Sequence, residues 1–172
     1  MAPDFRIAQT FISKCAQKNI KIVAGNRTPT MNIKLPKPPI PENAAGYADT
    51  AAGAAKNIDN LNLDYSTESL ETVEDILGRF HEEGLSVDKI GGALFAFGCY
   101  VGEVFIRNFG GKWKKEEETE MKGLAGFFIV VELPNGVICN PVGKVFKIVM
   151  DGEKGLAYFY YIMTKEDGTK SA

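Results

Sequence analysis

Seventeen consecutive residues, Ile90 to Ile106, carry a single charged side chain, that of Glu103. A helix that spans a membrane needs about 20 apolar residues and tolerates a carboxylate poorly. A helix that is apolar on every side is otherwise found at the centre of a domain, covered by its neighbours. The run therefore predicts a buried central helix, in which Gly98 and Gly102, one turn apart, let another element lie close against it.

A second helix is predicted just before this run. Its apolar side chains recur with helical spacing and form one stripe: Leu70, Val73, Ile76, Leu77 and Phe80. Ser66 is expected at the N-cap of this helix and Gly84 at its end. The only histidine, His81, falls in the solvated last turn, where the helix dipole favours a partly cationic side chain.

After the central helix, the sequence predicts a small antiparallel sheet. The pair Gly110-Gly111 ends the helix, and a strand opens at Trp113. The segment from Leu124 to Leu133 is rich in β-branched and aromatic residues, and the turn Pro134-Asn135-Gly136 leads into a strand over 137–139. Together with the strand at Trp113, this hairpin predicts three antiparallel strands.

Further helices complete the predicted core. Ala-rich sequence over 43–60 favours a helix, as does the segment from Pro141 to Met150, because proline suits the first helical turn. The last element, Leu156 to Met163, is rich in aromatic residues and fits a helix or a strand; after Gly155 we favour a helix. The predicted fold class is α+β, with a small antiparallel sheet packed against a buried central helix and flanking helices.

Residues 1–42 are expected to form an arm and residues 43–172 a single α+β domain. The segment from Phe5 to Cys15 has an amphipathic helical pattern, and five of the eight prolines lie within residues 29–41. That density predicts an extended connector, used either as a spacer across the domain or as a ligand for an aromatic groove of a partner. The arm is basic and the body acidic: residues 1–60 hold 8 Lys and Arg against 4 Asp and Glu, whereas residues 61–172 hold 12 against 18.

Glu103 is unusual because a carboxylate on a buried helix is unfavourable unless it is paired. Arg107 follows four residues later on the same face, in the order that favours an ion pair. One interpretation is a structural pair near the exit of the helix. The other is a polar site, with Glu103 as acid, base or ligand acceptor and Arg107 as an anion clamp. The candidate pocket would then be lined by Tyr100, Glu103, Arg107, Trp113 and Asn140.

Several chemistries are not expected from this sequence. Cys15, Cys99 and Cys139 are far apart and, with a single histidine, provide no zinc constellation, so we expect reduced thiols, no metal and no cofactor. No Lys- and Arg-rich run with interleaved aromatic residues points to nucleic acid. The amino terminus does not resemble a secretory signal, which favours the cytoplasm; an organellar address and peripheral membrane attachment through the first helix stay open.

Three motifs characterise the body: Leu63-Asp64-Tyr65-Ser66 with Glu68-Ser69-Leu70; Tyr100-Val101-Gly102-Glu103-Val104 with Arg107-Asn108 and Gly110-Gly111-Lys112-Trp113; and Asn140-Pro141. In these motifs, between Asn43 and Met163, the chain resembles a bacterial family of small uncharacterised cytoplasmic domains. The resemblance implies a shared fold without an activity, and its common features are Glu103, Gly111, Trp113 and Pro141. The basic, proline-rich arm departs from the family.

These observations favour a non-catalytic protein-interaction module of the immunity-protein or adaptor kind. The acidic run Glu116-Glu117-Glu118 with Glu120 would then face a basic partner. The alternative is a small-molecule-binding domain or an enzyme, with its pocket around Glu103 and Arg107 at the exit of the central helix. A concave cavity with Glu103 facing in favours the alternative, whereas a Glu103 closed onto Arg107 counts against it.

Overall fold

The computed structural model describes residues 19–22, 31–123 and 126–165. The elements before the central helix are β1 (Asn19–Ile22), β2 (Met31–Lys34), α2 (Pro41–Asp59) and α3 (Ser69–Glu82). The elements from the central helix onward are α4 (Val87–Asn108), β3 (Lys112–Lys115), the 3-10 helix η1 (Glu116–Glu118), β4 (Ile129–Glu132), β5 (Ile138–Cys139), α5 (Pro141–Asp151) and α6 (Leu156–Thr164). The helix predicted between Phe5 and Cys15 lies outside the described residues.

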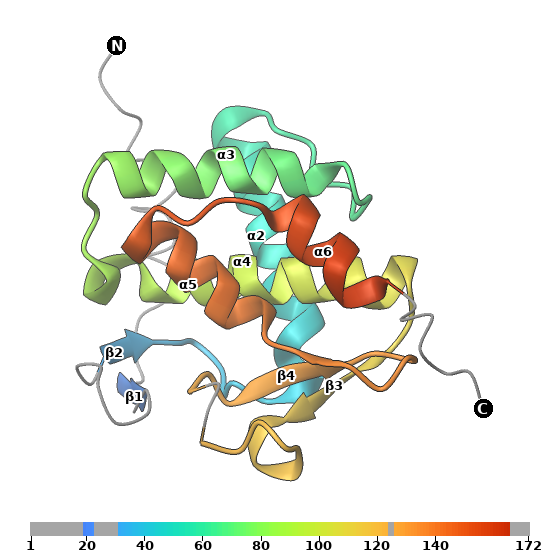
Figure 1. Ribbon diagram of the computed structural model, residues 1–172. Helices are drawn as coiled ribbons and strands as arrows, with labels where there is room; N and C mark the ends of the chain where they lie inside the picture. The colour runs from blue at the N-terminus through green and yellow to red at the C-terminus, as the bar shows by residue number, and fades with distance from the viewer. Residues whose placement is uncertain (1–18, 23–30, 124–125, 166–172) are drawn as a thin grey trace.

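The architecture is α+β, as predicted, with α4 at its centre (Figure 1). Helices α2 and α5 pack against α4, and α3 packs against α5 and α6. In Figure 1, α3 lies above α4, α5 and α6 lie in front of it, and the three-stranded sheet lies below. The final element, for which helix and strand were both open, is a helix.

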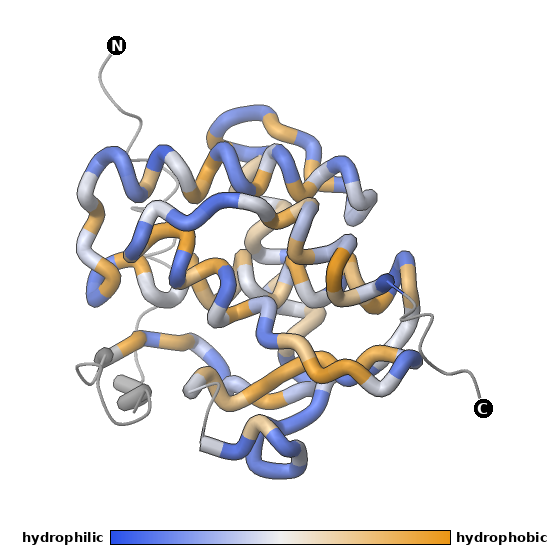
Figure 2. The backbone as a smooth tube through the Cα atoms, in the orientation of Figure 1, coloured by the Kyte–Doolittle hydropathy of each residue, from blue (hydrophilic) through white to orange (hydrophobic). Residues whose placement is uncertain are grey.

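Helix α4 is buried along most of its length, which confirms the prediction of a central helix. Every residue from Ile90 to Phe105 is buried. The helix is long and apolar enough to cross a membrane by length and composition, but 89% of its apolar window is buried inside the protein. Its apolar side chains are therefore covered by the surrounding helices and sheet, and Figure 2 shows its orange backbone enclosed by them.

The glycines of α4 lie where neighbouring elements approach most closely. A Cβ placed on Gly98 would lie 2.6 Å from the Cα of Val142 in α5. A Cβ on Gly102 would overlap the indole ring of Trp113. Close backbone packing therefore offsets the intrinsic disadvantage of glycine within a helix, about 1 kcal/mol each relative to alanine.

The three predicted strands form one antiparallel sheet of order β3-β4-β5. Its register places Trp113 opposite Val131 and Val131 opposite Cys139. Strand β4 is shorter than the expected segment from Leu124 to Leu133, because Phe128 has a φ of 67° and Gly126 a φ of 71°. These left-handed conformations interrupt an extended backbone just before Ile129.

The core extends to the amino-terminal side of residue 43, where we placed the domain boundary. Strands β1 and β2 form an antiparallel pair that the sequence analysis did not anticipate. Ile33 and Leu35 are fully buried in the same core as α4. The backbone of Lys37 both donates to and accepts from the hydroxyl of Tyr47 on α2. The proline-rich segment thus lies across the domain as a spacer and leads into α2 at Pro41.

Two side chains of α3 hold the connection between α5 and α6 at both ends. The Glu74 carboxylate accepts hydrogen bonds from the backbone N–H groups of Gly155 (2.8 Å) and Leu156 (2.6 Å), at the start of α6. His81 Nδ1 lies 2.7 Å from the carbonyl oxygen of Val149, and donates to it because a carbonyl only accepts. Each side chain suits the helix end that it caps, a carboxylate at an N-terminus and an imidazole at a C-terminus.

We expect Glu74→Ala to lower the free energy of unfolding by about 2 kcal/mol, because two backbone donors lose a charged acceptor. Urea unfolding followed by circular dichroism measures the effect. Asp75→Ala is the matched control, since Asp75 is exposed on the same helix and should change stability by less than about 0.5 kcal/mol. Equal losses for the two variants would contradict this role of Glu74.

Candidate functional site

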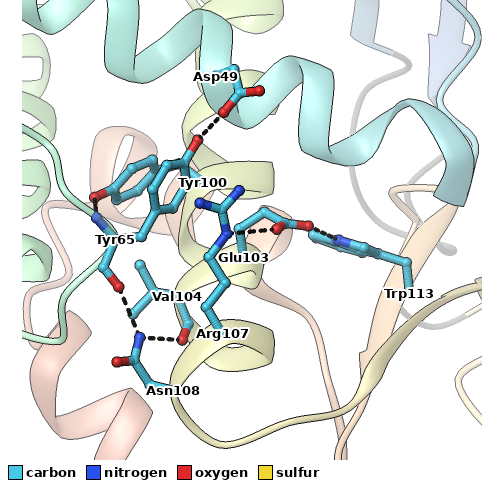
Figure 3. A network of polar contacts seen from close by, with 8 residues as sticks. All are labelled: Asp49, Tyr65, Tyr100, Glu103, Val104, Arg107, Asn108 and Trp113. Atoms are coloured by element: carbon cyan, nitrogen blue, oxygen red, sulfur yellow. Dashed lines mark hydrogen bonds and ion pairs between the residues drawn. The ribbon is translucent and has the colours of Figure 1, made fainter.

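The carboxyl-terminal half of α4 brings together four of the five predicted site residues (Figure 3). Tyr100, Glu103 and Arg107 share one face of the helix because they are three and four residues apart. Trp113 approaches from β3, and its indole N–H donates to Glu103 Oε1 at 2.9 Å. Arg107 Nε donates to Glu103 Oε2 at 3.1 Å. Both oxygens of the buried Glu103 carboxylate therefore have a donor.

Tyr65, which lies in the loop before α3, completes this cluster. Its ring stacks on Tyr100 with centroids 4.6 Å apart, and the Arg107 guanidinium carbon lies 3.5 Å from the centroid of the Tyr65 ring. Its hydroxyl donates to Asp49 Oδ1 at 2.6 Å. Its backbone N–H donates to the Tyr100 hydroxyl at 2.8 Å. The backbone of Tyr65 is left-handed, with a φ of 63°. Sequence spacing gave no sign of this role, because Tyr65 and Tyr100 are 35 residues apart.

Two further polar side chains attach this loop and the start of α3 to α4. Asn108 Nδ2 donates to the carbonyl oxygens of Tyr65 and Val104, both at 2.8 Å. The Ser69 hydroxyl forms a 2.7 Å hydrogen bond with the Tyr100 hydroxyl. The cluster therefore connects α2, the 60–66 loop, the start of α3, α4 and β3.

Burial fixes the protonation of the two tyrosines. It raises the pKa of Tyr65 well above the ordinary tyrosine value, and the hydrogen bond to Asp49 raises that pKa further. Burial also raises the pKa of Tyr100. Both phenols therefore stay protonated at neutral pH, as hydrogen-bond donors rather than as general bases.

Asn140, the fifth predicted residue, begins α5. Its side-chain oxygen accepts a 2.8 Å hydrogen bond from the backbone N–H of Gly143, which makes it the N-cap of that helix. The following Pro141 packs beside α4, where its Cγ would lie 3.2 Å from a Cβ on Gly102. Asn140 thus positions the helix start that lies against α4.

The geometry around Glu103 is that of a structural ion pair. Glu103 is closed onto Arg107 and Trp113, and the Arg107 guanidinium also lies on the Tyr65 ring. A general acid or base must reach a reacting group, and an anion clamp needs donors that are free to meet an anion. Here both oxygens of the carboxylate already have a donor, whereas Arg107 uses only its Nε in the pair and 43% of its side chain is exposed.

Two clefts among the described residues lie elsewhere. One, of about 360 Å³, lies between α3 and the α5–α6 connection, next to Gly78, His81 and Lys154. The other, of about 440 Å³, lies between the proline-rich segment and η1, next to Ile40 and Phe128. Within the described part of the chain, no group of three or more His, Cys, Asp and Glu residues is placed to hold a metal ion.

Cys99 and Cys139 are buried free thiols. Burial raises the pKa of Cys99 well above its usual value and raises that of Cys139 to about 12. Because the thiolate is the reactive form, we expect neither thiol to react with Ellman's reagent in the native protein at mildly alkaline pH. In a Cys15→Ser variant, Cys99 and Cys139 are the remaining cysteines, and unfolding in urea should make both thiols reactive toward the reagent. Reaction of the native pair at the rate of a free thiol would contradict the burial.

Comparison of the chain with protein-family models, with curated proteins and with solved structures gives no match. The likeness of the three motifs to bacterial domains therefore stays a prediction.

Proposed function

We propose that the chain is a non-catalytic protein-interaction module, and that it makes contact through the exposed side of α6. This side, called here the outer face of α6, consists of Ala157, Tyr158, Tyr161 and Ile162. The exposed fraction is 66% for Tyr158, 58% for Tyr161 and 45% for Ile162. Large apolar side chains gathered on one exposed helix face are typical of protein contact surfaces.

The composition of α6 supports the proposal more strongly than its exposure alone. Its nine residues include no charged side chain, and Figure 2 shows the helix pale or orange rather than deep blue. The inner side is covered, because Phe159 and Tyr160 pack on Phe105 with centroids 5.4 and 4.8 Å apart. A helix that is apolar all round is normally buried on all sides. Among the residues that the structure describes, the contacts of α6 cover only one of its sides.

The acidic turn is a second, weaker candidate surface. Glu117, Glu118 and Glu120 are exposed, whereas Glu116 is buried and belongs to the fold. Residues 112–122 contain four lysines beside these four glutamates, so this region carries no net charge. A basic partner is still preferred, because residues 61–172 hold 18 Asp and Glu against 12 Lys and Arg. The turn then adds electrostatic steering to a contact centred on α6.

An immunity-protein or adaptor role in the cytoplasm is the form of interaction that we prefer. The alternative is a small-molecule-binding domain or an enzyme, centred on Glu103 and Arg107. The interaction module is favoured because both oxygens of the Glu103 carboxylate already have a donor within the protein.

Native mass spectrometry of the protein purified gently from its own cells, at low salt, tests the two classes. We expect a stoichiometric protein partner, which includes a second copy of the chain, and no bound small molecule. A small molecule retained in stoichiometric amount would overturn the proposal. Replacing Glu117, Glu118 and Glu120 together with lysine should weaken recovery of the partner less than Tyr161→Glu does.

A further inference from the structure

We infer that α6 is a hinged helix, which detaches from the body as one unit and reattaches while the rest of the domain stays folded. Gly155 is its hinge, and the side chains of Glu74 and Asn135 hold its two ends in the closed state. The inference goes beyond the proposed function, because it concerns the chain alone and needs no partner. Opening uncovers Phe105 and the inner side of α6, which the closed state hides.

Helix α6 is attached to the body by little buried surface. Within the part of the chain that the structure describes, Leu156 is the only buried residue of α6. The preceding helix α5 has seven buried residues among eleven. Phe159 and Tyr160 are half-buried, and both pack on the side chain of Phe105. Because burial of apolar surface is the main force that holds an element in place, α6 should detach at a lower free energy than the core unfolds.

The connection between α5 and α6 can turn at Gly155. In Figure 1 this connection runs along α3 before α6 begins. The parts before Gly155 stay attached: His81 donates to the carbonyl oxygen of Val149, and Lys144 of α5 forms a 2.7 Å ion pair with Glu153. Gly155 itself has a left-handed φ of 100°, in a region where glycine is free to change conformation. A change of backbone angles there moves α6 and leaves α5 in place.

Side chains from two other elements hold the ends of α6. At its start, the N–H groups of Gly155 and Leu156 donate to the Glu74 carboxylate on α3. At its end, the carbonyl oxygen of Met163 accepts a 3.0 Å hydrogen bond from Asn135 Nδ2, in the turn between β4 and β5. A helix of nine residues is too short to persist alone in water. Detachment and loss of the helical hydrogen bonds of α6 therefore occur together.

Hydrogen exchange of the full-length protein measures this opening. Relative to their intrinsic rates, the amides from Phe159 to Thr164 should exchange about a hundredfold faster than the most protected amides of α4. Their protection should be nearly equal along α6 and should change little with low concentrations of urea, because a local opening exposes little surface. Protection that declines steadily toward Thr164 would instead indicate fraying of the chain end. That result, or equal protection of α6 and α4, would overturn the inference.

Glu103→Gln separates detachment of α6 from global unfolding. Glu103 bonds Trp113 and Arg107, and these contacts are the same whether α6 is closed or open. The variant should therefore lower the protection of α4 about fivefold and leave that of α6 unchanged. An equal fall in both helices would show that α6 exchanges only through global unfolding, which contradicts a hinged helix.

Glu74→Ala tests whether α6 opens as one unit. Loss of the carboxylate should lower the protection of α6 about thirtyfold, at Thr164 as much as at Phe159, although Glu74 contacts only the start of the helix. Asn135→Asp, which removes the amide donor at the other end, should also lower the protection of the whole helix. Asp75→Ala is the matched control and should leave the exchange of α6 unchanged, because Asp75 is exposed on α3. An effect of Glu74→Ala that is confined to the first amides of α6 would overturn the inference and leave the proposed function standing.

Discussion

Gly98→Ala should lower the free energy of unfolding by about 3 kcal/mol, in the range found when well-packed cores are overfilled. The added methyl group would lie 2.6 Å from the Cα of Val142, and backbone cannot give way as the end of a flexible side chain can. Helix α5 would have to move away from α4, which loosens the packing between these two helices. Urea unfolding followed by circular dichroism measures the loss.

Gly78→Ala is the matched control, because nothing lies within 4 Å of a Cβ at that helical position. Alanine there should leave stability unchanged or raise it by up to about 1 kcal/mol, through better helix propensity. A loss of less than about 0.5 kcal/mol for Gly98→Ala would show that α4 and α5 do not pack as closely as described.

Glu103→Ala should also cost about 3 kcal/mol, because it leaves two donors without their acceptor. The indole N–H of Trp113 and the guanidinium of Arg107 both bond this carboxylate. Glu103→Gln should cost about 1 kcal/mol, since the amide oxygen can still accept from Trp113 while its NH₂ group faces Arg107 unfavourably.

The two variants together distinguish structure from chemistry at this position. A structural Glu103 predicts that loss of function follows loss of stability, so that Glu103→Gln stays functional while it is folded. If Glu103 were an acid or base, Glu103→Gln would abolish function at nearly full stability. Thermal unfolding and recovery of the partner, measured on the same preparations, separate these outcomes.

Local sequence signals predicted most of the elements. The apolar run from Ile90, the Pro134-Asn135-Gly136 turn and the proline at position 141 each act within a few residues, so their structural effect can be foreseen. The N-cap of α3 is an exception: the hydroxyl of Ser66 accepts from the N–H of Ser69 at 3.2 Å, but regular helix begins only at Ser69 and the N-cap position is Glu68, because a turn precedes the helix.

The contacts that complete the candidate site depend on tertiary structure. The spacing of Glu103 and Arg107 on one helix predicts their ion pair. The second donor to the Glu103 carboxylate, Trp113, comes from a strand whose direction depends on the whole sheet. Tyr65 adopts a left-handed backbone that only its surroundings favour. Likewise, Glu74 caps α6 from 81 residues away, which no local pattern indicates. The sequence therefore predicts the ion pair of Glu103 and Arg107, but not the tertiary contacts that surround it.

The outer face of α6 is the centre of this account, and partner recovery from the native cell tests it most directly. Tagged wild-type, Tyr161→Glu and Glu103→Gln chains are produced at equal levels, and all that co-elutes with each is weighed by native mass spectrometry. We expect the wild type and Glu103→Gln to retain the same protein partner, a second copy included, and Tyr161→Glu to lose it while remaining folded. A Tyr161→Glu chain that keeps its partner, or a partner lost only with Glu103→Gln, would contradict the account.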